Sequence, residues 1–416
     1  MYTSWRHAWE DTATIVRRRQ VSGLWIGMLL WGCSPLEATL SPASVPDTGS
    51  NRIEISLGPG QDLRAYTTAS IGELELLISH QTSGSFVELP ALSEGVYPLA
   101  LDGQSTGATL TVYPAELIVE FVDVGQGDAV IIRAPSGEAY LVDTGPSGSA
   151  EVLRQRLRHH QIERLEQVIL THTDADHIGG LAELLEGPDG LIGSADDLVV
   201  GALVEDGSLS ERTTQTARTL HALTIDRLPR RVAQAGDAIT LPGGFRLATM
   251  SAGGATVTQP ASQEAQAHAN ARSVTLTVCL DGWCGWLGGD LTGGGLNTPD
   301  VERLVSRELG AMAFVKVPHH GSRSSSSAGL VETLSPRLAV MSLGTNNDHC
   351  HPTPEVVQRW SRTATVLSTG SGQVSPGRCD ETSWPATSRA GCGSMTLSKG
   401  SRPTATISCG AELITF

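Results

Sequence analysis

Residues 171–180 read Thr-His-Thr-Asp-Ala-Asp-His-Ile-Gly-Gly, so two imidazoles and two carboxylates lie close together in the chain. Imidazole nitrogen and carboxylate oxygen are ligands that divalent metals take in proteins. The segment follows Val168-Ile169-Leu170, an apolar run that predicts a buried strand. A helix does not place residues at offsets of two, four and five on one face, so we expect a loop at the strand's end. The predicted metal ligands are His172, Asp174, Asp176 and His177.

The elements around this loop must bring it to other ligands. Gly179-Gly180 allows a tight turn before a helix predicted at 181–185. Upstream, the patterns predict strands at 117–122, 129–132, 140–142 and 167–170, with an amphipathic helix at 150–160. More than one strand for each helix favours an α/β sandwich over a doubly wound nucleotide fold. The glycine-rich residues 124–128 precede a strand and not a helix, which excludes a dinucleotide-binding loop.

Composition limits the kind of protein. The chain has 416 residues, 40% of them hydrophobic, which is ordinary for a globular protein and excludes a disordered one. Its formal net charge of −15 excludes a broad basic surface and disfavours tight, sequence-independent binding of duplex nucleic acid. A polyanionic substrate would have to be held by metal and by local side chains.

The first residues predict export. Arg17-Arg18-Arg19 precedes an apolar stretch at 21–32 that is too short to span a bilayer and suits a signal peptide, here 1–33. The stretch ends Leu30-Trp31-Gly32-Cys33, which resembles the bacterial lipobox, and we expect Cys33 to carry a lipid that anchors the chain to a membrane. Ser34 resembles the signal for sorting to the outer membrane. Cleavage by the ordinary signal peptidase and a longer anchor helix remain alternatives.

The chain then divides into parts of different composition. Residues 34–51 are rich in Ser, Pro, Thr and Ala and predict a flexible tether. Residues 52–114 alternate polar and apolar groups between Gly and Ser turns, which predicts a small β-sandwich-like domain without a ligand cluster. Its role, as a spacer or as a binder of glycans or a partner, stays open. Residues 115–416 contain the predicted α/β sandwich.

Six of the seven cysteines remain beside Cys33, an even number that suits disulfides in an exported chain. Strands predicted at 274–280 and 283–287 flank an Asp281-Gly282 turn, which makes Cys279 and Cys284 a non-hydrogen-bonded pair. Their expected Cα separation of about 4.5 Å is one that a disulfide accepts. Three pairings stay open for Cys350, Cys379, Cys392 and Cys409. The alternative for Cys350 is a metal-ligand role beside His349 and His351.

Together these segments resemble a known family. Residues 116–410 are similar to the metallo-β-lactamase superfamily, and specifically to the soluble hydrolase domain of ComEC-type competence proteins. The motifs that carry the resemblance are Phe121-Val122-Asp123-Val124-Gly125-Gln126-Gly127-Asp128-Ala129, Leu141-Val142-Asp143-Thr144-Gly145, the His172 to Gly180 loop, Asn270-x-x-Ser273, Gly288-Gly289-Asp290, Val317-Pro318-His319-His320-Gly321-Ser322, and Ser342-x-Gly344 with Asn347 and His351-Pro352. No multi-pass channel is expected in this chain, so a transport role does not carry over.

The resemblance implies an αββα sandwich with metals at the ends of the sheets. His172 and Asp174 would bind a first metal, and Asp176 and His177 a second, with Asp290 bridging and His320 completing the second. The broader superfamily has His in place of Asp174 and often a further His at the first metal. Asn270 is expected near that gap, and first-site occupancy is expected to be weak.

Further residues are expected around the metals. Asp143 would orient a ligand histidine, although a strand-end turn is the alternative. His319 and His320 adjoin on a segment predicted to be extended, so only one can face the metal, and the resemblance favours His320. Ser322 and Ser325 of the serine-rich run 322–327 would help to hold a phosphate, unless this run is a flexible loop. The remaining candidates are His351, as a general acid, a ligand or a structural residue, and Asp123 and Asn347, as second-shell or substrate-contacting groups.

Three carboxylates among six expected ligands make a hard, anionic site, so manganese or magnesium competes with zinc. One or two divalent ions would supply hydroxide near neutral pH, which suits phosphodiester hydrolysis dependent on Asp176. The leading hypothesis is an exported phosphodiesterase or nuclease acting on single-stranded DNA or nucleotides. The alternatives are a hydrolase of a lactone, β-lactam or choline phosphate ester, and a surface lipoprotein that binds metal without catalysis.

Overall fold

The computed structural model describes residues 36–41, 44–47, 51–187, 189–190, 197–211, 214–345, 347–371, 388–400 and 404–416. The predicted signal peptide with Cys33, and Cys379, lie outside the described residues. In the described part of the chain, no helix has the length and apolar character needed to cross a membrane.

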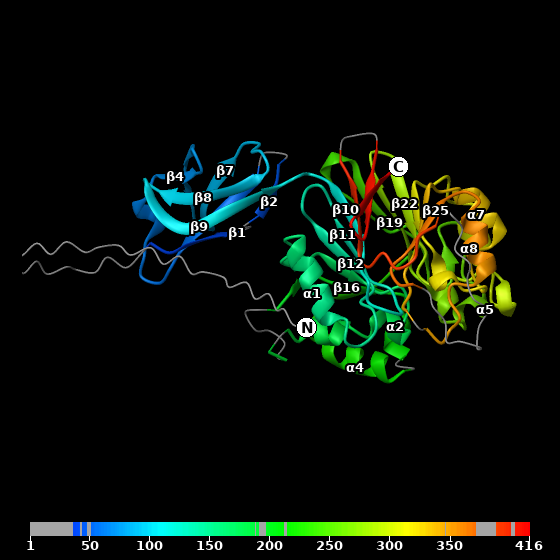
Figure 1. Ribbon diagram of the computed structural model, residues 1–416. Coiled ribbons are helices and arrows are strands. Elements are labelled where there is room, and N and C mark those ends of the chain that lie inside the picture. Colours follow the sequence, from blue (N-terminus) through cyan, green and yellow to red (C-terminus); the bar gives the residue numbers. More distant parts are fainter. Residues whose placement is uncertain are drawn as a thin grey trace, which may run out of the picture.

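Two small sheets at the beginning of the chain pack face to face (Figure 1, blue and cyan). One has the order β1 (Ala38–Ser41), β3 (Asn51–Leu57), β7 (Gly84–Leu89) and β6 (Ser79–Gln81). The other has the order β2 (Ser44–Pro46), β9 (Gln104–Tyr113), β8 (Gly95–Leu101), β4 (Thr68–Ile71) and β5 (Leu74–Leu77). Inward-facing alternate residues such as Ile53, Val87 and Leu110 form a core that is separate from the rest of the molecule.

Part of the predicted tether is in fact strand. β1 pairs with β3 and β2 pairs with β9, so residues 38–41 and 44–46 belong to this β-sandwich. The physical reason is the alternation in Ala38-Thr39-Leu40-Ser41, which lets Leu40 pack on the sandwich core, and Val45, which is buried. Serine and proline content concealed these apolar contacts.

The second part is a four-layer sandwich with two sheets inside. The first sheet has the order β17 (Arg230–Val232), β16 (Leu203–Glu205), β14 (Gln167–Ile169), β12 (Ala139–Val142), β11 (Val130–Arg133), β10 (Leu117–Phe121), β26 (Met395–Lys399), β27 (Thr406–Cys409) and β28 (Glu412–Thr415). The second has the order β18 (Ala238–Thr240), β19 (Phe245–Ala252), β21 (Thr275–Leu280), β22 (Trp283–Leu287), β23 (Phe314–Lys316), β24 (Leu338–Met341) and β25 (Thr365–Ser368), with β20 (Ala255–Thr256) on β19.

Three apolar cores hold these layers together. Phe121, Phe245 and Phe314 belong to the core between the sheets. The helices α1 (Ala150–His159), α3 (Leu181–Leu185) and α4 (Gln215–Thr224) pack on the outside of the first sheet. The helices α6 (Glu302–Val305), α7 (Ala328–Leu334) and α8 (Pro354–Trp360) pack on the outside of the second. The predicted αββα sandwich is therefore confirmed (Figure 1).

The predicted hairpin is also confirmed. β21 and β22 pair with Cys279 opposite Cys284, and these residues form a disulfide with a Cα separation of 4.1 Å. Asp281 and Gly282 both have positive φ, as a two-residue turn requires. A second disulfide joins Cys392 to Cys409. Cys350 is disulfide-bonded as well, which overturns the alternative that it is a thiolate metal ligand.

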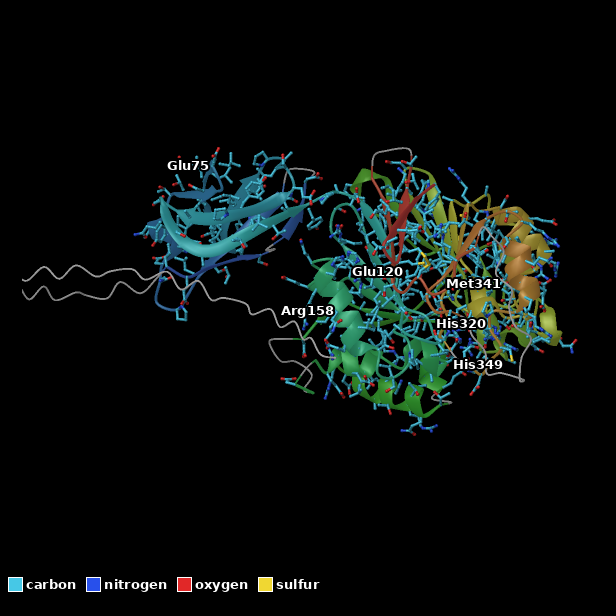
Figure 2. The ribbon with its side chains drawn as sticks, in the orientation of Figure 1. Glu75, Glu120, Arg158, His320, Met341 and His349 are labelled. Carbon is cyan, nitrogen blue, oxygen red and sulfur yellow. A yellow bond between two sulfur atoms is a disulfide. The ribbon has the colours of Figure 1, made fainter. Side chains whose placement is uncertain are left out.

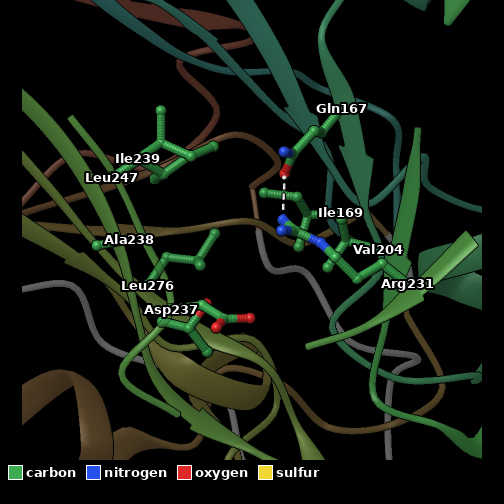
Figure 3. A pocket seen from close by; sticks show the side chains of 10 residues that line it. Gln167, Ile169, Val204, Arg231, Asp237, Ala238, Ile239, Leu247 and Leu276 are labelled. Carbon is green, nitrogen blue, oxygen red and sulfur yellow. Dashed lines mark hydrogen bonds between the residues drawn. The ribbon is translucent and has the colours of Figure 1, made fainter. Parts of the chain in front are cut away.

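A small cavity of about 90 Å³ opens between the two sheets near their β17 and β18 edges (Figure 3). Its lining is mixed: Ile169, Val204 and Leu276 are apolar, and Arg231, which donates to Gln167, is among the polar lining residues. None of the sequence-predicted site residues lines this cavity, so it is not the site that the motifs predict.

Candidate metal centre

Side chains from both halves of the sandwich meet where strands of the two sheets end. The first half contributes the residues after β12 and β14, and the second half contributes those after β22 and β23. Figure 2 shows His320 between the green first half and the orange second half. Asp174 is the N-cap of the short helix α2 (Ala175–Ile178), so Asp176 and His177 lie on a helical turn where the sequence predicted a loop.

One group of side chains is compact. His320 Nε2 lies 3.3 Å from Asp176 Oδ2 and 3.7 Å from Asp290 Oδ2, and His177 Nε2 lies 3.3 Å from Asp290 Oδ1. His177, His320 and Asp290 are almost completely buried, whereas the Asp176 side chain is 34% exposed. We call Asp176, His177, His320 and Asp290 the inner group.

A second group is looser. His172 Nε2 lies 3.4 Å from Asp174 Oδ2 and 4.0 Å from Asp290 Oδ2. The Asp174 side chain is 44% exposed. Among the described residues, the clusters whose ligand atoms all lie within 4.8 Å of one another include His172, His177 and Asp290, but none includes Asp174. We call His172, Asp174 and Asp290 the outer group.

Hydrogen bonds determine which nitrogen of each imidazole carries the proton. His320 Nδ1 lies 2.8 Å from the Ser342 carbonyl, which only accepts, so Nδ1 is the donor. His177 Nδ1 likewise donates to Asp143 Oδ2 at 2.7 Å. The Thr171 hydroxyl donates to Asp143, so it accepts from His172 Nδ1 at 3.0 Å. Each neutral imidazole therefore directs an unprotonated Nε2 towards Asp290.

These inward-facing atoms lack hydrogen-bond partners. The Nε2 atoms of His172, His177 and His320 and Oδ1 of Asp290 are buried without one. Leaving several such atoms unsatisfied in one place is costly, and a divalent cation would satisfy all of them. The donor set therefore fits the metal that the sequence predicts, and the individual ligand roles remain predictions.

Asp143 lies behind the histidines. It adopts a left-handed backbone conformation at the end of β12, and its carboxylate accepts from His177 Nδ1, Thr171 Oγ1 and the Thr171 amide, the last at 2.8 Å. These contacts orient His177 directly and His172 through the Thr171 hydroxyl. This is the position that an orienting carboxylate needs.

The prediction that His319 and His320 point to opposite sides is wrong. Pro318–Gly321 is a 3-10 turn in which His319 and His320 both have positive φ, so the backbone is not extended. His319 Nε2 lies 3.6 Å from Asp290 Oδ2, close to the corresponding distance for His320. Asn270 Nδ2 lies 3.3 Å from His319 Nε2. His319 therefore faces Asp290 on the side where a first-site histidine was expected to be missing.

The serine-rich run is neither a flexible loop nor a free phosphate cradle. Ser322, Ser324, Ser325 and Ser326 are buried. The Ser325 hydroxyl donates to the carbonyls of Pro318 and Ser322, and Ser322 Oγ contacts Ser324 Oγ. Ser324 Oγ lies 2.8 Å from His319 Nδ1. The run thus packs behind His319, and Ser324, which the sequence analysis did not select, makes the contact.

The other predicted residues divide into two kinds. The Asn347 side chain makes two hydrogen bonds with the backbone of His351: it donates to the carbonyl at 2.6 Å and accepts from the amide at 3.1 Å. The His351 ring lies 5.4 Å from that of His319, and its buried Nδ1 has no hydrogen-bond partner. Asp123 instead accepts from the Gly125 amide, a local turn contact. His351 thus belongs to the centre, whereas Asp123 makes no described contact with it.

Neighbouring charges shift the pKa values of the histidines in the centre. Burial alone would lower the pKa of His320, but Asp290 and Asp128 outweigh it and raise the pKa to about 10. The pKa of His177 is raised well above its usual value against burial, by Asp290 and Asp143. Burial and the neighbouring His319 and His320 lower the pKa of His351 to about 3. Without metal, protons on His177 and His320 therefore balance part of the carboxylate charge.

A cavity of about 410 Å³ lies beside the inner group. It is lined by Gln126, Pro146, Ser147, Ala175, Asp176, Gly179, Thr216 and His349. No lysine or arginine is among these residues, so the cavity offers polar groups and the Asp176 carboxylate but no basic side chain of these two kinds. The ring of His351 lies 6.1 Å from that of His349 and 6.5 Å from that of His320.

Comparisons with known proteins support the predicted family resemblance. Residues 122–258 match the sequence model of the Metallo-beta-lactamase superfamily. The chain is 29% identical over 279 residues to ComE operon protein 3 of Bacillus subtilis (strain 168), which covers 61% of this chain and 32% of that protein. It is 26% identical over 248 residues to competence protein ComA of Neisseria gonorrhoeae, covering 59% and 29%. The chain thus spans about a third of the length of these relatives.

Solved structures with some likeness include a diphosphatase from the PhnP family, at 15% identity and a TM-score of 0.35, covering 60% of this chain and 94% of that one. Zn²⁺-bound PqqB from Methylobacterium extorquens has 12% identity and a TM-score of 0.36, with coverages of 58% and 85%. These scores carry no argument about function. The sequence matches do confirm the predicted resemblance to the metallo-β-lactamase superfamily and to ComEC-type competence proteins, and the chain has the metallo-β-lactamase fold.

Proposed function

We propose that this protein is a metal-dependent phosphodiesterase, with single-stranded DNA or a nucleotide as its substrate class. The observation that carries the proposal is the arrangement of the Nε2 atoms of His172, His177 and His320 around the buried Asp290 carboxylate, beside a cavity. The fold supplies a hydrolase scaffold, and competence proteins are among the relatives that the chain matches.

A divalent ion held there would lower the pKa of water towards neutrality and stabilise charge on a phosphodiester. Its ligands would be the inner group, with the outer group holding a second ion. Manganese is the proposed ion, with zinc or magnesium as competitors, because carboxylates make up half of the expected ligands.

The residues around the ions would position the substrate. The cavity suits the uncharged part of a diester, since Asp176 lines it and no lysine or arginine is present there to hold further phosphates. His351, whose Nδ1 lacks a partner, is the side chain available to exchange a proton with the substrate or leaving group. Asp176 is the member of the inner group that lines the cavity, and its carboxylate lies 3.3 Å from His320 Nε2.

The chain is also proposed to be exported and held at the bacterial envelope through a lipid on Cys33. Disulfides at Cys279–Cys284 and Cys392–Cys409 are compatible with an oxidising compartment. Palmitate labelling of the intact chain, with Cys33→Ala as the control, tests the anchor.

Hydrolysis of bis-p-nitrophenyl phosphate and labelled single-stranded DNA tests the activity, with manganese, magnesium or zinc added after chelation. Metal-dependent cleavage should be lost in Asp176→Ala while the folded state remains. A neutral lactone or β-lactam hydrolysed with two zinc ions, and no diester cleavage, would favour the other hydrolase class. Metal binding without turnover of either substrate class would favour a binding lipoprotein.

A further inference from the structure

A lysine lies behind the metal centre, and neither the motifs nor the relatives assign it a role. Lys316 ends β23 in the second sheet and is only 2% exposed. Its ammonium donates to the Asp128 carboxylate and to the Gly289 carbonyl, the latter at 3.1 Å. A lysine is rarely buried so completely, because desolvating its charge is costly unless a partner compensates.

Asp128 connects this lysine to the inner group. Its Oδ1 lies 3.3 Å from His320 Nδ1, and its Oδ2 lies 3.9 Å from His177 Nδ1. The Asp128 amide donates to the Asp176 carbonyl at 3.1 Å. On the other side, Gly289 directly precedes Asp290. The Lys316–Asp128 pair therefore contacts, directly or through adjacent backbone, all four members of the inner group, and it joins the two halves of the sandwich.

The charges agree with a role in metal binding. The carboxylates of Asp128, Asp143, Asp174, Asp176 and Asp290 bring five negative charges to the centre, and Lys316 brings one positive charge. The remaining four negative charges equal the charge of two divalent ions. In the described part of the chain, Lys316 is the only lysine or arginine with an ion pair to any of these five carboxylates.

We propose that Lys316 and Asp128 are a positioning pair for the inner metal. Lys316 fixes the Asp128 carboxylate beside His320, where its negative charge lies 3.3 Å from Nδ1 and favours a proton on that atom, which donates to the Ser342 carbonyl. With Nδ1 as the donor, the ring is held so that Nε2 is the atom directed at the ion. The inference rests on the proposed function only in that the centre must bind a divalent ion, and it does not depend on the substrate.

The test measures Mn²⁺ affinity by calorimetry on folded protein, without any substrate. Lys316→Met removes the ammonium, Asp128→Asn removes the carboxylate charge at nearly the same shape, and a double variant removes both. The matched control is Glu120→Gln, because Glu120 is a fully buried carboxylate paired with His160 and Arg156 away from the centre. Long-range nitrogen–proton spectra of the histidine rings report the His320 tautomer in each protein.

Each single variant should weaken the tighter Mn²⁺ site about 10- to 100-fold, the usual effect of losing a residue that orients a ligand. The double variant should stay equally weak, because the two residues act as a unit, and the Nδ1–H signal of His320 should change. Glu120→Gln should leave the affinity unchanged.

A purely structural ion pair gives a different result. It would lower the melting temperature of the single variants while their Mn²⁺ affinity stayed within about threefold of the parent, and that outcome would overturn the proposal. Parental Mn²⁺ affinity in the double variant would also overturn the proposal. The losses in the single variants would then come only from the buried charge left without its partner. If Lys316→Met does not fold, Asp128→Asn and the double variant still decide. A parent chain that binds no ion would instead overturn the metal centre itself.

Discussion

The inner and outer groups share Asp290 but differ in how firmly the fold holds them. In the inner group His177 donates to Asp143, His320 donates to Ser342, and the histidines are buried. In the outer group Asp174 is 44% exposed and caps a helix of only four residues without a side-chain capping bond. Ligands fixed by a second layer of hydrogen bonds lose little entropy on binding. The comparison predicts that two sites of one centre differ in metal affinity although their ligand types are similar.

Removing the shared ligand should have the largest effect. Asp290→Ala deletes a carboxylate that lies within 4.0 Å of His172, His177, His319 and His320. We expect metal binding at both groups to be lost and diester hydrolysis to fall by at least about 10³-fold, because each ion would supply several kcal/mol. Calorimetry with Mn²⁺ and the bis-p-nitrophenyl phosphate assay measure both. One ion retained at parental affinity would contradict the bridging role.

Because the two groups differ, substitutions of Asp176 and Asp174 should have unequal effects on metal binding. Asp176→Asn should abolish binding of the tighter ion, whereas Asp174→Asn should leave that ion in place and weaken only the second. The reason is that Asp174 is absent from every compact cluster among the described residues. Titration of the chelated protein with Mn²⁺ gives the two affinities separately. Equal losses in the two variants would mean that the groups are not independent.

Much of this centre could be predicted from the sequence, because many of its residues lie in short segments whose local pattern indicates their structure. The strand before His172, the hairpin with Cys279 and Cys284, and the order of the motifs follow from short-range patterns that the fold then confirmed. The turn at His319 could not be predicted in the same way. Two positive φ angles at non-glycine residues are unfavourable locally and are held by contacts with Gly289 and Ser324, which are set by the tertiary fold.

The buried carboxylates of Asp128 and Glu120 have partners that could not be predicted from the sequence. Lys316 lies in the strand β23 and Asp128 at the end of a glycine-rich motif, and no pattern in the sequence indicates that they pair across 188 positions. Glu120 and His160 likewise pair under α1, although His160 lies in a polar sequence that favours a surface position. Long-range charge pairs leave no periodic signal in one sequence.

The histidine protons provide a pH test of the inner group. A histidine whose pKa is raised on folding stabilises the fold at low pH, and this stabilisation is lost as pH rises through the folded pKa, here from about 6.5 towards about 10 for His320. The melting temperature of the metal-free protein should therefore fall by several degrees between pH 7 and pH 10. Metal replaces these protons, so the loaded protein should change less. An identical fall with and without Mn²⁺ would contradict the assignment of the inner group.

The smallest expected effect concerns the support of His319 on the outer side. Glu302 is fully buried and accepts from the amides of Ser326 and Ser327 at 2.6 and 2.7 Å, and burial raises its pKa to about 7. Glu302→Gln keeps one acceptor oxygen and should cost about 1–3 kcal/mol of stability, because one amide is left with a poorer partner. Through the serine-rich run and Ser324, this substitution should weaken binding of the outer ion about threefold and leave binding of the inner ion unchanged.

Glu308→Gln is the matched control, since Glu308 also accepts from two amides but holds residues 256–258, away from the centre. If Glu302→Gln weakened the inner ion more than the outer one, the division of the centre into a firmly held and a loosely held group would have to be reversed.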